Sequence, residues 1–142
     1  MKNILIILTV LFAAGFMKTT QAQTVTPLTN AEFKEKIWDY VSDKDWNYKG
    51  NKPAIIDMYA NWCGPCKRLA PILAEIQKDY GDKLQIYKVD TDKEVQLAQL
   101  FNVTSIPLMI FIPAKGKPFL VTGLRPKEQL VQLINEKLFD KK

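Results

Sequence analysis

The stretch Trp62-Cys63-Gly64-Pro65-Cys66-Lys67 contains both cysteines of this 142-residue chain. It follows a short apolar run, Ala54 to Tyr59, whose length and isoleucines indicate a buried strand. After the cysteines, apolar residues recur at the spacing of one helix face, at Leu69, Ile72, Leu73 and Ile76. Pro71 should kink this helix, and Gly81 should end it. The two cysteines therefore lie where a buried strand passes into the N-terminus of a helix.

This position suits disulfide exchange. The unpaired N–H groups of a first helical turn and the helix dipole both favour the thiolate form of Cys63. The thiolate is the nucleophile in disulfide exchange, and Cys66 lies one turn further along the same face. A four-residue ring constrains the unfolded chain little, so a disulfide that only stabilises would gain little entropy. We expect a reversible, catalytic Cys63–Cys66 disulfide, with a purely stabilising surface disulfide as the alternative.

The composition excludes several other classes of site. The chain has no histidine, which removes imidazole-assisted catalysis and histidine metal sites. Tetrahedral zinc needs four ligands, and two cysteines cannot supply them, although a metal bridging two chains stays open. We expect no metal and no cofactor. The net charge of +5 is scattered among acids, without a basic run interleaved with aromatics, so no nucleic-acid partner is expected.

The N-terminus has the pattern of a secretory signal peptide. Met1-Lys2-Asn3 is short and positive, and Ile4 to Phe16 is an almost unbroken apolar run. Thr20-Gln21-Ala22 is close to the small-x-small pattern of a cleavage site. Spanning a bilayer takes about 20 apolar residues, more than this run offers, so an uncleaved anchor is the weaker interpretation. We expect a signal peptide over residues 1–22 and a mature domain over 23–142, exported to the periplasm.

The remaining chain alternates helices and strands. Thr29-x-x-Glu32 and Thr91-x-x-Glu94 are candidate capping boxes, predicting helices that run to about Val41 and from Asp92 to about Phe101. Between Ser42 and Lys52 we expect a loop whose aromatic residues, Trp46 and Tyr48, fold back onto the body. Further strands are predicted at Leu84–Val89, Pro107–Ile112 and Phe119–Thr122, and a last helix from Pro126. The fold class is α/β, with a mixed sheet covered by helices on both faces.

The residues around the cysteines resemble the active-site region of the thioredoxin family. The similar segment runs from Asp57 to Lys67 and continues with Leu69-Ala70-Pro71, and a distant Ile106-Pro107 also agrees. The resemblance extends from Leu28 to Phe139. It implies the thioredoxin fold, a central mixed sheet of about four to five strands flanked by four helices, and thiol–disulfide exchange. Tyr59, where the family often has tryptophan, is a departure, as is the long loop before the Ala54 strand.

The resemblance also implies individual roles. Cys63 is the attacking cysteine, Cys66 the resolving one, and Asp57 the buried acid that handles the proton of Cys66. A poorly solvated carboxyl has a raised pKa, which suits this role. An aspartate at a strand edge, paired with a lysine, is the alternative. Lys88 matches a lysine that neighbours this aspartate in many family members, and could otherwise be an ordinary surface lysine.

A substrate surface is implied as well. Ile106-Pro107 matches a cis-proline loop that faces the cysteines, and its backbone would pair with an extended substrate segment. The flat apolar contact surface would comprise Trp62, Gly64, Pro65, Ile106 and Gly123, beside Pro107.

The expected function is that of a periplasmic protein-disulfide reductase, a monomer that receives electrons from a membrane thiol donor and passes them to exported proteins. Gly64-Pro65 resembles the reducing members of the family, and without a histidine between the cysteines the reduced state is less favoured. An oxidase or isomerase in the same compartment is one alternative. A non-catalytic binding module with the same fold is another.

Overall fold

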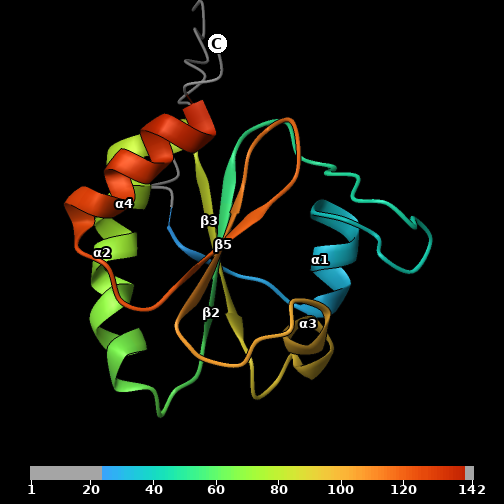
Figure 1. Ribbon diagram of the computed structural model, residues 1–142, viewed down its shortest axis with the longest axis horizontal. Coiled ribbons are helices and arrows are strands. Elements are labelled where there is room, and N and C mark those ends of the chain that lie inside the picture. Colours follow the sequence, from blue (N-terminus) through green and yellow to red (C-terminus); the bar gives the residue numbers. More distant parts are fainter. Residues whose placement is uncertain (1–23, 140–142) are drawn as a thin grey trace, which may run out of the picture.

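The computed structural model describes residues 24–139, so the predicted signal peptide lies outside the described residues. Its centre is a five-stranded sheet with the order β1-β3-β2-β4-β5 (Figure 1). The strands are β1 (Thr26–Pro27), β2 (Ala54–Tyr59), β3 (Gln85–Asp90), β4 (Leu108–Ile112) and β5 (Phe119–Thr122). The first three run parallel, and β4 is antiparallel to both β2 and β5. The predicted mixed sheet is confirmed.

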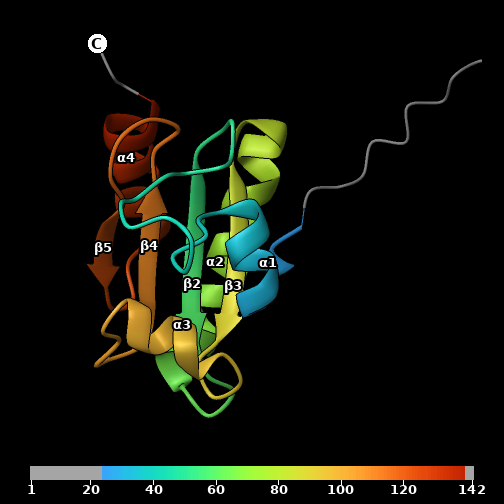
Figure 2. The same ribbon diagram turned by 90° about the vertical axis from the view of Figure 1, so that its right-hand side faces the viewer.

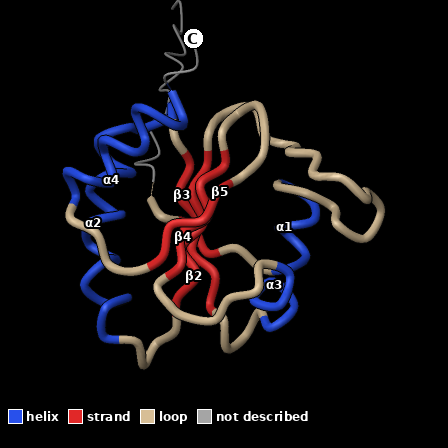
Figure 3. Tube along the Cα trace, in the orientation of Figure 1, coloured by secondary structure: helices blue, strands red, loops and turns tan. Residues whose placement is uncertain are grey.

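Within residues 24–139, four α-helices cover the sheet in two layers. They are α1 (Asn30–Lys36), α2 (Gly64–Tyr80), α3 (Val95–Leu100) and α4 (Lys127–Ile134). A 3₁₀ turn (Gly81–Lys83) follows α2, and a π-helical turn (Asn135–Phe139) follows α4. Helices α2 and α4 lie on one face, and α1 and α3 lie on the other (Figures 1 and 3). Among the described residues, no helix combines the length and apolar character needed to span a bilayer.

The central strand β2 contributes to both cores. Ile56 packs into the cluster beneath α1 and α3, whereas Ile55 packs into the cluster beneath α2 and α4. Because successive side chains of a strand point to opposite faces, Asp57 shares the α2 face with Ile55. Every residue of β2 from Ala54 to Met58 is buried, which explains why this strand reads as a continuous apolar run. The one acid in that run lies under the helix that carries the cysteines.

Helix α1 is shorter than predicted. The Thr29 capping box is present, with the Thr29 side chain and the Glu32 carboxylate each accepting the partner's backbone N–H. The helix ends at Lys36 instead of near Val41, because the Asp39 carboxylate accepts the N–H groups of Val41 and Ser42 and so forms a turn.

The second predicted capping box is wrong. The Thr91 hydroxyl donates to the carbonyl of Tyr59 at 3.0 Å, and Glu94 accepts the N–H of Asn30 at 2.9 Å. Helix α3 therefore begins at Val95, without a side-chain cap. The side chains of Thr91 and Glu94 bind the ends of neighbouring elements, so neither of them caps the first N–H groups of α3.

The long loop before β2 does fold back, as predicted. The indole N–H of Trp46 donates to the carbonyl of Gly116 at 3.1 Å, and the Trp46 ring stacks on Tyr48. The hydrogen bond of Trp46 holds the loop against the connection between β4 and β5, and the backbones of the two segments lie side by side in the turned view (Figure 2). The two-residue strand β1 was not predicted; it pairs with Tyr87 and Lys88 at the edge of the sheet.

Candidate active site

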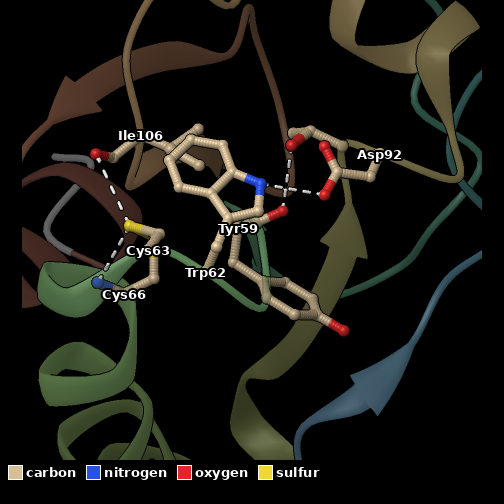
Figure 4. Close-up of a disulfide and its surroundings, with 7 residues drawn as sticks. Tyr59, Trp62, Cys63, Cys66, Asp92 and Ile106 are labelled. Atoms are coloured by element: carbon tan, nitrogen blue, oxygen red, sulfur yellow. Dashed lines mark hydrogen bonds between the residues drawn. A yellow bond between two sulfur atoms is a disulfide. The ribbon is translucent and has the colours of Figure 1, made fainter.

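The two cysteines are joined in a disulfide at the start of α2 (Figure 4). Cys63 is the N-cap residue of the helix, in an extended conformation, and its Sγ accepts the N–H of Cys66 at 3.2 Å. A helix N-terminus thus supplies one of its unpaired donors to the attacking sulfur, as inferred from the sequence. Both cysteines are more than nine-tenths buried in this oxidised state, packed against Ala60, Tyr59 and Ile106.

A cis-proline loop faces the disulfide. The Ile106–Pro107 peptide bond is cis, as the resemblance implied, and the carbonyl oxygen of Ile106 lies 3.9 Å from Cys63 Sγ. The N–H of Gly123, a residue with φ of +87°, donates to the carbonyl of Pro107 at 2.8 Å. This bond ties the end of β5 to the loop before β4. Segments far apart in the sequence therefore meet beside Cys63.

Trp62 is fixed beside the disulfide although its side chain is 71% exposed. Its indole N–H donates to the carboxylate of Asp92 at 3.0 Å, as Figure 4 shows. The backbone N–H of Asp92 donates in turn to the side chain of Asp90 at 3.0 Å. Sequence reasoning missed Asp92, whose position directly after Thr91 was read as part of a helix start. The sequence signal that could have identified Asp92 is its position. It is an acid that follows β3, and β3 lies next to β2, the strand that leads to the cysteines.

The other expected surface residues lie around the same point. Gly64 and Pro65 are exposed in the first turn of α2, Ile106 and Gly123 are partly exposed, and Pro107 is buried. An exposed tryptophan, a proline and an isoleucine around a disulfide form an apolar surface suited to a protein segment. The structure thus brings together all the residues expected to contact substrate.

Asp57 lies beneath this surface, in the centre of the sheet. Its side chain is 4% exposed, and its Oδ1 has no hydrogen-bond partner among the described residues. Burial raises the pKa of Asp57 to about 7, and the charge of Lys88 opposes that rise. The strand-edge alternative is wrong, because β2 is flanked by β3 and β4. A carboxyl with this pKa can take up and release a proton near neutral pH.

Lys88 is placed beside Asp57 by strand pairing. The two residues are register partners on β2 and β3, and Lys88 is half-buried, with its Nζ 6.0 Å from the centre of the Tyr59 ring. Both line a pocket of about 410 Å³ with Ala70 and Pro71 of α2. Ala70 lies one turn beyond Cys66, so this pocket places Asp57 and Lys88 beside the turn of α2 that follows the resolving cysteine.

A sequence model of the family described as Thioredoxin matches residues 24–136. The chain is 44% identical over 109 residues to a thioredoxin of Borreliella burgdorferi, covering 77% of this chain and 93% of that protein. It is 38% identical over 115 residues to a thioredoxin of Staphylococcus aureus, covering 80% and 98%.

Among solved structures, chloroplastic thioredoxin z shares the fold. Its TM-score is 0.67 at 21% sequence identity, over 80% of this chain and 93% of that one. The family match spans both cysteines, the buried aspartate and the cis-proline. The chain therefore belongs to the thioredoxin family of thiol–disulfide oxidoreductases, with Cys63 and Cys66 as its C-x-x-C pair.

Proposed function

We propose that this thioredoxin is a protein-disulfide reductase that acts outside the cytosol. The groups around Cys63 are the observation that supports reduction, as opposed to oxidation, of substrate disulfides. Among the described residues, the Sγ of Cys63 has two hydrogen-bonding neighbours, the N–H of Cys66 and the carbonyl of Ile106. Neither is an imidazolium, and a strongly oxidising C-x-x-C protein requires a reduced form that is specially stabilised. Disulfide reduction is accordingly the favoured direction.

The reaction would proceed in two exchanges. In the reduced protein the Cys63 thiolate attacks a substrate disulfide, forms a mixed disulfide and expels the first substrate thiolate, which takes a proton from water. Asp57 then accepts the proton of the Cys66 thiol. The Cys66 thiolate attacks Cys63 Sγ and expels the second substrate thiolate. Two electrons pass to the substrate, and the Cys63–Cys66 disulfide of the structure is formed.

The compartment rests on the first 22 residues. Their positive start, apolar run and small-x-small end are typical of a signal peptide, and the family match begins after them, at residue 24. In the periplasm the reductase would need electrons from a membrane thiol donor, and its substrates would be exported proteins with disulfides. We propose that it works there as a monomer.

The midpoint potential tests the direction of electron flow. The protein is equilibrated in glutathione or dithiothreitol buffers, and the fraction of Cys63–Cys66 disulfide is measured. A potential of about −270 mV is expected for a reductase, whereas about −120 mV would show a strong oxidant and overturn the proposal. Reduction of insulin in the presence of dithiothreitol separates both from a non-catalytic binding module, which would give no reduction.

Export is tested separately, in cells that produce the full chain. Fractionation is expected to place the protein in the periplasm, and N-terminal sequencing is expected to begin at Gln23. A cytosolic protein that keeps Met1 would contradict the proposed compartment and leave the exchange chemistry in place.

A further inference from the structure

Basic side chains lie on one side of the apolar contact surface. We propose that Arg68 and Arg125 give this protein a preference for disulfides flanked by acidic residues, so that its partners are acidic protein segments. The inference rests on the proposed function as a protein-disulfide reductase and names the substrate class of the same site. Its basis is the position and the pairing of these two arginines.

Arg68 reaches back over the start of α2. It lies four residues after Gly64, on the same exposed face of the helix. A Cβ built on Gly64 would lie 3.8 Å from Nη1 of Arg68. Apart from the chain neighbours of Gly64 and the backbone of its own helix, no other described heavy atom would lie within 4 Å. The guanidinium is therefore beside the residue that follows Cys63. A segment held at the disulfide would lie within reach of its charge.

Arg125 approaches from the connection between β5 and α4. Its Nη2 donates to the carbonyl of Thr122 at 3.2 Å, and Thr122 pairs with Leu108, the residue after Pro107. The neighbouring Leu124 is 38% exposed. Arg125 thus stands next to the strand end that holds the cis-proline loop. The loop's expected role is to pair with substrate backbone.

The two arginines lie on the same side of the site. The connection that carries Arg125 leads directly to Lys127 at the start of α4, and Lys127 forms an ion pair with Glu75 of α2 at 3.1 Å. Glu75 is two turns beyond Arg68 on the same helix. On the opposite side of the disulfide, the charge next to Trp62 is the carboxylate of Asp92.

Neither arginine is neutralised within the described part of the chain. Lys127 is held by both Glu75 and Asp79, and Lys36 by Glu32, but no carboxylate lies within 4.0 Å of Arg68 or Arg125 among residues 24–139. Arginine is suited to bidentate binding of carboxylates. Unpaired charges at an interface mainly raise association rates and select partners of opposite charge. An acidic segment is the occupant that this arrangement favours.

The test uses three synthetic peptides that share one intramolecular disulfide and differ only in the residues flanking its cysteines, which are Asp, Asn or Lys. The chain is first reduced chemically and freed of reductant, and the second-order rate constant for a single round of peptide reduction is measured by acid quench and chromatography. At low ionic strength we expect the Asp peptide to react about tenfold faster than the Lys peptide, with the Asn peptide between them. Salt at about 0.5 M should remove most of the difference.

Charge reversal in the double variant Arg68→Glu/Arg125→Glu should invert the order of the peptides. The matched control, Lys78→Glu/Lys83→Glu, makes the same change in net charge near the far end of α2 and in the turn after it. These positions are about 20 Å or more from the cysteines along the helix, so the control should keep the wild-type order of the peptides. Equal rates for the three peptides, or a preference for acid that survives the Arg68/Arg125 reversal, would overturn the proposal. Because the protein is reduced chemically, the ratio is measured whatever its midpoint potential. Failure of the reductase direction therefore remains a separate result.

Discussion

The indole of Trp62 and the carboxylate of Asp92 are joined across the active-site surface by a 3.0 Å hydrogen bond. The bond links the residue before the attacking cysteine to the segment that follows β3. Trp62 would otherwise be a large exposed side chain with several accessible rotamers. With one ring position held, its apolar face is ready for a partner, and less rotamer entropy is lost on binding.

Removing the acceptor should weaken this preorganisation. Asp92→Ala is expected to lower kcat/KM for protein disulfides about fivefold, the equivalent of about 1 kcal/mol for one net hydrogen bond. Asp92→Asn keeps an acceptor oxygen and should stay near the wild-type value. Asp45→Ala, at an exposed acid in the long loop, serves as the control. A loss of the same size in all three variants would show an effect of charge instead of one on Trp62.

The raised pKa of Asp57 predicts how stability depends on pH. In the oxidised protein the carboxyl has a pKa of about 7, against an ordinary value of 3.8 in the unfolded chain. Between these values the folded state binds more protons, so the free energy of unfolding falls as pH rises, by about 4 kcal/mol in total. Above about pH 7 the free energy of unfolding has lost this full amount. Asp57→Asn should remove the decline and be the more stable protein at pH 8.

Denaturant unfolding of the oxidised protein and of Asp57→Asn at several pH values between 4 and 8 provides the measurement. The difference between the two stability curves isolates Asp57 from the other acids of the chain. Two curves that run parallel over this range would contradict the assignment of a buried, titrating carboxyl.

Lys88 should act on the same titration in the opposite direction. Its positive charge lowers the pKa of Asp57, so Lys88→Met is expected to move the Asp57 midpoint above about 7. The midpoint is measured by carbon NMR of the labelled side-chain carboxyl in the oxidised protein. Lys78→Met, on the exposed far end of α2, is the control and should leave the midpoint unchanged. An unchanged midpoint in Lys88→Met would return Lys88 to the class of ordinary surface lysines.

The different roles of the cysteines lead to different products. Cys66→Ser keeps the nucleophile but cannot resolve the mixed disulfide, so it should accumulate covalent complexes with protein substrates. Cys63→Ser should form none and should lose exchange at least a thousandfold, on the order of other nucleophile deletions. Mass spectrometry of complexes trapped in the native compartment identifies the partners. Complexes formed through Cys66 by the Cys63→Ser variant would reverse the assignment.

Much of the fold was predictable because each element carries a local signal. The buried strand β2 and the amphipathic α2 were recognised from hydrophobic spacing, and the Thr29 box marked the start of α1. The signals that failed involve side chains whose partners are distant in sequence. Thr91 and Glu94 match a capping box, yet they bind Tyr59 and Asn30, which periodicity cannot reveal.

The active site shows the same limit. Cys63 and Cys66 were identifiable from their spacing and sequence context, and Asp57 was identifiable as a charged residue within an apolar run. The Trp62–Asp92 bond depends on the pairing of β2 with β3, since it joins residues from the two loops that follow these strands. The position of Arg125 beside the cis-proline loop depends on the pairing of β4 with β5. Strand β1 has only two residues, too short a stretch for alternation to be detected.

Helix α2 is fixed at the end away from its cysteines by one buried side chain. Gln77 donates to the carbonyl of Leu84 at 2.8 Å and accepts the N–H of Ile86 at 2.6 Å, which fastens the last turns of the helix to β3. Opening and closing of the disulfide must therefore be absorbed within the first turn and the loop before it. We therefore expect a partner to meet nearly the same molecular outline before and after electron transfer. Its release then depends on cleavage of the mixed disulfide, without help from a change of shape.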